Sequence, residues 1–456
     1  MVMRGRVGPA DTAVAGMVDA RPEGGGPVTR ERRESVVGGV LRVIGLVLTV
    51  ACLIGLCRFL WPQPDADAQP AGTWRQLAFV RGALDRGADV AAQDQFPEGY
   101  YFLNALYGLA WVQAGRTDPG HRVEALRESR WALARLESSQ GRAVFSPRLQ
   151  PAYGIFWAGW TNWLRGAILT LSGADDPEEV RRFTEASTEI AAAFDRSGTP
   201  YLQAYPGQVW PVDSTVAIAS LRLHDSLFAP GYGRVVARWL EGVRSRLDPA
   251  TGLMPHRVSA VDGAVVEGAR ATSQTMIHRF LPEIDAEFAA TQYAGFRSRF
   301  LDYPLGFGPA IREYPRGNDG VGDVDSGPLI AGISLSATVV ASGAARVNGD
   351  HDLAAALGSE GELLGVPLTL PGTKRYAGGL VPIADAFLVW SATARLFAAA
   401  PVTATAATVR WWWRAPWLLL LAAGALAPWT GRLARGLGWT QRRWCARPRR
   451  AVGFTP

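Results

Sequence analysis

The stretch from Ala152 to Leu171 reads AYGIFWAGWTNWLRGAILTL and has the composition of a helix that is buried on most sides. Arg165 is its one charged residue, and its tryptophans recur at near-helical spacing. Gly173 is suited to ending this helix, and Asp176 followed by Pro177 is typical of the start of another. We therefore expect a buried helix that is joined by a short turn to a second helix.

About twelve segments between residues 70 and 400 show this helical periodicity, and strand alternation is scarce. Charged, amphipathic segments alternate along the chain with apolar, aromatic ones, as expected for an outer layer of helices around an inner layer. The expected segments are 73–90, 98–115, 119–139, 152–172, 176–196, 213–226, 230–247, 270–284, 285–302, 326–348, 350–364 and 382–399. The layout predicts an all-α protein with an (α/α)6 toroid, and an open α-solenoid is the alternative.

Two apolar stretches flank this region. The first contains Val43–Cys57, which reads VIGLVLTVACLIGLC, and the second is Trp411–Trp429, which has tryptophans at both edges. We expect transmembrane helices over 36–61 and 411–429. A cleaved signal peptide or a lipidated Cys52 is the alternative for the first stretch, and a buried helix is the alternative for the second.

The charge is divided by region. Residues 1–61 carry +3 and residues 401–456 carry +9, whereas residues 62–400 carry 30 basic and 36 acidic residues. The positive-inside rule then predicts a two-pass cell-membrane protein with both termini in the cytoplasm. Basic ends that serve orientation also argue against a nucleic-acid partner.

This division predicts the following domains: a disordered cytoplasmic tail (1–35), a linker (62–72), an extracytoplasmic domain (73–400), a second linker (401–410) and a basic cytoplasmic tail (430–456). The cysteines Cys52, Cys57 and Cys445 all lie outside the 73–400 domain. Disulfide and thiol chemistry are therefore excluded there.

Long connections precede the expected inner helices, so a closed ring would gather them at one end. Acidic residues recur there, and converging carboxylates raise one another's pKa, which provides an acid beside a base. The expected catalytic residues are Asp213 with one of Asp323 or Asp325, supported by Glu98 and Glu267. Capping of the following helices is the alternative role for these acids.

The loop aromatics Tyr201, Tyr205, Trp210, Tyr303 and Tyr314 are expected to stack on sugar rings. Polar and aromatic residues of the same segments are the expected substrate-binding residues. They are Tyr101, Tyr153, Trp157, Trp210, Arg270, Gln274, Tyr314, Tyr376 and Asp385. Core packing is the alternative for Trp157, and mutual packing of loops is the alternative for the loop aromatics. No cofactor is predicted. No metal is predicted either, because the spacing of the acids in the 318–325 loop does not fit an EF-hand, and a calcium ion in this loop is the alternative.

Three motifs, Tyr153–Trp157, Gly207–Asp213 and Gly322–Gly327, resemble the linalool dehydratase-isomerase-like branch of the six-hairpin toroid superfamily. That superfamily includes many glycoside hydrolases and polysaccharide lyases. The resemblance implies the toroid fold and a central crevice. Members of the branch with known chemistry use active-site cysteines, which this domain lacks, so no catalytic residue is transferred.

These observations predict a membrane-anchored hydrolase that uses paired carboxylates on a glycan or another small-molecule substrate. One alternative is a hydro-lyase or isomerase like the resembled branch but without its cysteines. The other is a non-catalytic binding or assembly protein of the cell envelope.

Overall fold

The computed structural model of the protein describes residues 28–63, 70–398 and 408–430. These residues are mostly helical, which confirms the all-α prediction, and their strands form three short two-stranded hairpins. The chain divides into two compact units, of which the larger comprises Leu53–Ala422. The smaller unit contains the chain up to Cys52 and from Ala423 onward.

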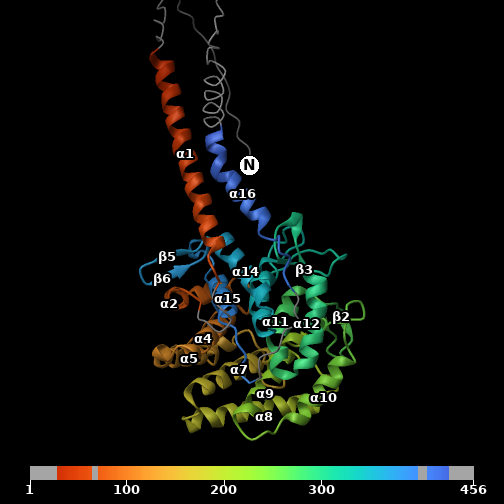
Figure 1. Ribbon diagram of the computed structural model, residues 1–456. Coiled ribbons are helices and arrows are strands. Elements are labelled where there is room, and N and C mark those ends of the chain that lie inside the picture. The colour runs from red at the N-terminus through yellow and green to blue at the C-terminus, as the bar shows by residue number, and fades with distance from the viewer. Residues whose placement is uncertain (1–27, 64–69, 399–407, 431–456) are drawn as a thin grey trace, which may run out of the picture. The chain divides into compact units, whose positions relative to one another are not determined.

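By their contacts, six helices of the larger unit form an inner set, and most of them are labelled in Figure 1. They are α4 (Gly99–Thr117), α7 (Gly154–Ser172), α9 (Pro211–Leu227), α11 (Ala271–Ile284), α13 (Leu335–Val347) and α15 (Pro382–Ala392). Each packs against the next in this order, and α15 packs against α4. Aromatic side chains fill the space between them: the ring of Trp160 on α7 contacts those of Phe102, Phe280 and Trp390. Burial of these large rings is the main driving force that holds the inner helices together.

A second set of helices alternates with the inner set along the chain. It consists of α2 (Thr73–Asp85) with α3 (Ala88–Gln93), α5 (Arg122–Leu136), α8 (Pro177–Arg196), α10 (Gly233–Arg244), α12 (Ala286–Phe300) and α14 (His351–Leu364). Each packs on at least one inner helix; α8, for example, contacts α7 and α9. Phe183, Ile190 and Phe194 of α8 are buried, whereas Arg181 and Glu178 pair at the surface. The amphipathic pattern of these segments thus produces one packed face and one solvated face.

The connections contain the strands and the short helices. β1 (Arg257–Val258) pairs with β2 (Val265–Glu267), β3 (Leu301–Asp302) with β4 (Ala310–Ile311), and β5 (Leu368–Leu370) with β6 (Thr373–Arg375). The short helices are η1 (Pro119–His121), α6 (Ser139–Arg142), η2 (Pro304–Gly306) and η3 (Ala377–Gly379). Each hairpin lies within or at the edge of one of the long connections that precede α11, α13 and α15.

The start of α13 differs from the expected segment 326–348. The helix begins at Leu335, where the Ser334 hydroxyl accepts a hydrogen bond from the Ala337 amide at 3.2 Å and caps the first turn. Gly332, at φ 78°, stands in the left-handed region just before this cap. Residues 326–334 therefore belong to the preceding connection, and Asp325 does not adjoin a helix.

The last inner helix is also shorter than the expected segment 382–399, since α15 ends at Ala392. Beyond it, the backbone amides of Phe397 and Ala398 donate to the carboxylate of Glu283 on α11, at 2.7 and 2.9 Å. These bonds give the two backbone amides hydrogen-bond acceptors although this part of the chain is not helical.

Two apolar helices complete the described chain. α1 (Val28–Leu60) starts before the predicted residue 36, so residues 28–35 are helical and not a disordered tail. Its part Gly38–Leu60 is long and apolar enough to cross a membrane. α16 (Ala415–Leu426), followed by η4 (Ala427–Trp429), is apolar but shorter than the second predicted span, 411–429. The tails 1–27 and 431–456, most of the predicted linkers (64–69 and 401–407) and the last two residues of the predicted 73–400 domain lie outside the described residues.

Within the smaller unit, a polar contact joins the two apolar segments. The Thr49 hydroxyl donates to the Ala425 carbonyl at 3.0 Å, and the Trp429 indole donates to the Thr49 hydroxyl at 2.8 Å. These bonds pair polar groups of two otherwise apolar segments.

Gly159 provides a test of the close packing between α7 and α9. A Cβ atom at this position would lie 3.0–3.1 Å from the Cβ, Cα and N atoms of Ala217. We expect Gly159→Leu to lower the free energy of unfolding by about 1–3 kcal/mol, because backbone atoms would have to move apart. Thermal unfolding followed by tryptophan fluorescence measures the change.

Gly233→Leu is the matched control, because a Cβ there meets no atom within 4 Å. Equal melting temperatures for the two variants would contradict the tight approach of α7 and α9.

Candidate functional site

Three of the predicted acids interact electrostatically although they come from distant parts of the chain. Glu98 immediately precedes α4, Asp213 lies in the first turn of α9, and Asp325 lies in the connection before α13. Burial raises the pKa of Asp213 well above its usual range, and the negative charges of Glu98 and Asp325 add to the effect. Glu98, Asp213 and Asp325 are named the acid cluster below.

The environment of Asp213 favours a protonated carboxyl group. Its side chain is buried, and none of the described residues forms a hydrogen bond or ion pair with its carboxylate oxygens. An ionised carboxylate in such a place lacks both water and a compensating donor, which costs several kcal/mol. Asp213 is therefore the member of the acid cluster best suited to donate a proton.

Asp325 has a different environment. It is exposed at the surface, although the surrounding chain shields part of its carboxyl group. This shielding, together with the charges of Asp323 and Glu98, raises the pKa of Asp325 to about 6, and the charge of Arg270 opposes them. Near neutral pH Asp325 is mostly ionised, so the cluster contains an acid and a base at the same pH.

Tyr205 joins Glu98 to the cluster. Its hydroxyl donates a hydrogen bond to the Glu98 carboxylate, and its ring contacts that of Trp210 edge to face at 6.1 Å. Burial raises the pKa of Tyr205, and the charges of Glu98, Asp213 and Asp325 raise it further, so the phenol stays protonated. Tyr205 was one of the loop aromatics expected to stack on sugar rings, but nothing in its local pattern links it to Glu98, which is 107 positions away.

Helix capping does not account for these three acids. Glu98 occupies the N-cap position of α4 but accepts no hydrogen bond from the helix, and the N-cap residue of α9 is Trp210, not Asp213. In α13 the cap is Ser334. The capping alternative therefore fails for all three, and their proximity needs another explanation.

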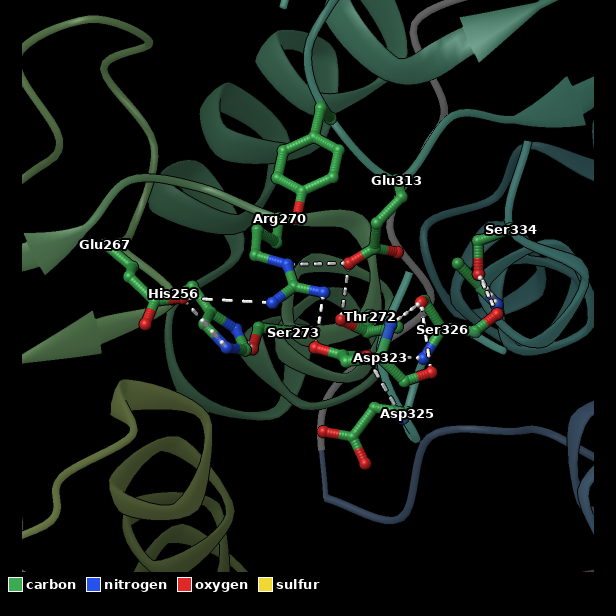
Figure 2. A network of polar contacts seen from close by, with 12 residues as sticks. His256, Glu267, Arg270, Thr272, Ser273, Glu313, Asp323, Asp325, Ser326 and Ser334 are labelled. Carbon is green, nitrogen blue, oxygen red and sulfur yellow. Dashed lines mark hydrogen bonds and ion pairs between the residues drawn. The ribbon is translucent and has the colours of Figure 1, made fainter. Parts of the chain in front are cut away.

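A second group of charged residues surrounds Arg270, at the start of α11 (Figure 2). Its guanidinium donates from Nε to Glu313 Oε1 at 2.9 Å, and Nη2 lies 2.6 Å from Asp323 Oδ2. Asp323 also accepts the backbone amides of Asp325 and Ser326, at 3.1 and 2.9 Å. One arginine thus holds the connection that carries Asp325 against the start of α11.

Although burial works against it, the pKa of Asp323 is lowered by the Ser326 amide and by Arg270. Asp323 is therefore ionised and committed to this ion pair, whereas Asp325 is free of it. In Figure 2 the Asp325 carboxylate points away from the Arg270 guanidinium. Of the two sequence candidates, Asp325 is the better partner for Asp213.

Glu313 is the residue of this network that was missing from the sequence predictions. Its side chain is fully buried, and Oε1 accepts hydrogen bonds from Arg270 and from the Thr272 hydroxyl, both at 2.9 Å. Burial raises the pKa of Glu313 to about 7. It follows a β-strand and precedes no helix, so the search for acids at helix starts passed over it. A charged pair, Arg312-Glu313, followed by Tyr314 in a long connection was the available signal.

Glu267 lies on the other side of Arg270, at the end of β2. It pairs with Arg257 at 2.6 Å, and its other oxygen is 3.8 Å from both His256 Nε2 and Arg270 Nη1. Burial lowers the pKa of His256 to about 4, so this imidazole is neutral at pH 7 and hydrogen-bonds Ser273 at 2.6 Å. Glu267 therefore belongs to the Arg270 network and not to the acid cluster.

The predicted aromatic binding residues occupy different environments. Tyr101 is buried, and its hydroxyl donates to the Trp157 carbonyl at 3.0 Å. The Trp157 indole donates to the Leu136 carbonyl at 3.1 Å, and its ring contacts that of Tyr153 at 5.2 Å. These contacts are typical of residues that pack in the core, which is the alternative role given above for Trp157.

Trp210 and Tyr314 lie nearer to the acids. Trp210 is partly buried and touches Tyr205, and Tyr314 lies under the Arg270 guanidinium at 5.2 Å. Of the predicted polar residues, Gln274 is buried and donates to the Met254 carbonyl at 2.6 Å. Of the predicted aromatic binding residues, Trp210 therefore lies near the acid cluster and Tyr314 lies in the Arg270 network.

Tyr376 and Asp385 form a separate cluster. The Asp385 carboxylate accepts the Tyr376 amide at 3.0 Å and the Gln76 amide group at 3.3 Å, and the Tyr376 hydroxyl donates to Glu362 at 2.6 Å. Burial raises the pKa of Asp385 to about 7. None of the acid cluster shares these contacts.

Within residues 28–63, 70–398 and 408–430, no three His, Cys, Asp or Glu side chains are grouped as metal ligands, and this includes the described 318–325 loop. In the comparisons with known proteins, no family model and no curated protein matches this sequence. The site must therefore be interpreted from its own geometry.

The pH dependence of stability tests the environment of Asp385. Its pKa is about 7 in the folded protein and about 3.9 in an unfolded chain. The folded state thus binds the extra proton between these values, and stability falls as the pH rises from about 4 to 7. We expect Asp385→Asn to be more stable than the wild type at pH 8, by a few kcal/mol, and equal to it at pH 4. Thermal unfolding at both pH values measures this.

Asp319→Asn is the control, since its side chain is 93% exposed. A stabilisation by Asp385→Asn that is the same at pH 4 and pH 8 would contradict the raised pKa.

Proposed function

We propose that this protein is a glycoside hydrolase in which Asp213 is the general acid and Asp325 is the general base or nucleophile. The observation that carries the proposal is the acid cluster: burial and, after it, the charges of neighbouring carboxylates raise the pKa values of Asp213 and Asp325, and none of the three acids of the cluster caps a helix. Cleavage of a glycosidic bond requires one protonated and one ionised carboxyl group.

The neighbouring residues have supporting roles in this proposal. The negative charge of Glu98 opposes ionisation of Asp213. The protonated phenol of Tyr205 donates a hydrogen bond to Glu98. Arg270, through Asp323, positions the turn that contains Asp325. Trp210 and Tyr314 are the proposed platforms for sugar rings, because a flat apolar face with a polar edge suits a pyranose ring.

For the fold, we propose the (α/α)6 toroid. Six inner helices that pack in a cycle, with outer helices alternating along the chain, support this proposal. In such a fold every inner helix starts at the same end, which accounts for the meeting of residues from the starts of α4, α9 and α11 with the connection before α13.

For the location, we propose a two-pass cell-membrane protein with the 73–400 domain outside. The apolar helix Gly38–Leu60 supports one span. The second span rests on the apolar composition of 411–429, which α16 and η4 partly cover, and on the arginines that follow it in the sequence.

Substitution of the two principal acids tests the enzymatic proposal. We expect Asp213→Asn and Asp325→Asn each to lower kcat/KM by about 10²–10⁴-fold in a screen of glycans with the full-length protein in detergent. In the wild type, the acidic limb of the pH profile is expected near pH 6, where Asp325 ionises. Release of reducing sugar measures the rate.

Asp319→Asn, in the loop that precedes Asp323, is the matched control and should keep full activity. An apolar alcohol is assayed in parallel, since the resembled branch acts on terpenes. Full glycan hydrolysis by either Asn variant, or turnover of the alcohol alone, would reject the proposed roles.

Reporter fusions test the topology. Alkaline phosphatase is active only outside the cytoplasm, so we expect activity when it is fused after Ala398 and none when it is fused after Pro456. An active fusion at Pro456 would show that 411–429 does not cross the membrane, and an inactive fusion at Ala398 would place the domain inside.

A further inference from the structure

A large groove lies in the larger unit, apart from the acid cluster. Its volume is about 1140 Å³, and it is bounded by the end of α1, by α13 and α14, and by the β5–β6 hairpin. Glu98, Asp213 and Asp325 are not among its lining residues. Sites for small molecules usually measure about 300–1,000 Å³, so the groove is large enough for a ligand with long chains.

The walls of the groove are mainly apolar. Ile330, Ile333 and Leu335 line one side, and Leu357 and Leu364 line another. Ile330, Leu335 and Leu364 are more than half exposed, which is unusual for aliphatic side chains that have no ligand to cover them. The groove thus offers a continuous apolar surface to an apolar ligand.

Two arginines without a described carboxylate partner are among the residues that line the groove. Arg58 donates to the Pro367 carbonyl at 2.7 Å, and Arg75 is exposed; within the described residues neither forms an ion pair. Lys374, by contrast, is paired with Glu362 at 2.7 Å. The two arginines are therefore available to an anion.

Glu360, the other acid of the wall, does not cancel this charge. Its side chain is buried and accepts a hydrogen bond from the Trp417 indole at 2.8 Å. Burial raises the pKa of Glu360 to about 8, so it is mostly protonated at pH 7. The groove as a whole is apolar with a net positive charge.

The groove is continuous with the apolar helix α1. Cys57 and Arg58, which line it, belong to the segment Gly38–Leu60 that is able to span a membrane. Trp61, the next lining residue, is 70% exposed, and tryptophan is typical of the boundary between lipid and water. If α1 spans the membrane, this part of the groove is at the level of the lipid headgroups.

We propose that the groove binds an anionic membrane phospholipid, with the acyl chains along Ile330, Leu335 and Leu357 and the phosphate beside Arg58 and Arg75. The charge selects an anionic headgroup, and the apolar walls replace the lipid environment of the chains. The proposal depends on the membrane span of α1 and is independent of the glycoside hydrolase proposal.

Native mass spectrometry of the full chain in mild detergent tests the proposal. We expect added phosphatidylglycerol to be retained and phosphatidylcholine to be lost. Arg75→Gln should weaken phosphatidylglycerol binding about tenfold, since it removes one arginine–phosphate contact. Ala355→Trp should abolish binding, because Ala355 lines the groove and the indole would fill it.

Arg148→Gln and Ala91→Trp are the matched controls, because both residues are exposed and outside the groove. Asp213→Asn should bind lipid as the wild type does, which separates this test from that of the hydrolase. Equal retention of the two lipids, or unchanged binding by Arg75→Gln and Ala355→Trp, would overturn the proposal.

A photo-crosslinking amino acid at the exposed rim position Leu335 identifies the occupant in native membranes. The proposal expects a phospholipid adduct. A crosslink to another segment of this chain or to a second protein, with no lipid adduct, would show that the groove is a protein-docking surface and would overturn the proposal.

Discussion

The ion pairs of Arg270 with Glu313 and Asp323 are the interactions on which the arrangement of the site depends. Arg270 lies at the start of α11, whereas both acids belong to the connection between α12 and α13. Because Glu313 is fully buried, removing the guanidinium would take away the charged partner of its carboxyl group and raise its pKa further. The position of the turn that carries Asp325, and with it the composition of the acid cluster, follows from this one side chain.

The Arg270 network and the acid cluster differ in how their carboxylates are compensated. Around Arg270, acids are neutralised by a cation and by backbone amides, which makes the network rigid. In the acid cluster no described cation pairs with Asp213. Burial and the negative charges of Glu98 and Asp325 therefore favour the protonated form of Asp213. Burial alone also raises pKa values elsewhere in the protein, as at Asp385 and Glu360. The acid cluster differs from those sites in that several carboxylates from distant parts of the chain interact, which is typical of proton-transfer chemistry.

Much of the helical layout was predictable, because the periodicity and composition of a segment such as 152–171 are local properties. The prediction was wrong at the start of α13, where a serine cap and Gly332 delay the helix, and at the start of α1, which begins at Val28. Glu313 was missed, and the bond of Tyr205 to Glu98 was not predicted, because each depends on a partner more than forty positions away.

The sequence by itself determined the all-α class, the alternation of amphipathic and apolar helices, the apolar span near the N-terminus and the separation of basic ends from an acidic body. All of these depend on neighbouring residues or on simple composition. Only the tertiary structure decided that Asp213 has no described partner, that Asp323 is neutralised while Asp325 is not, and that an apolar groove adjoins α1. The physical reason is that burial and charge pairing arise from contacts between connections, and a local pattern does not specify which connections meet.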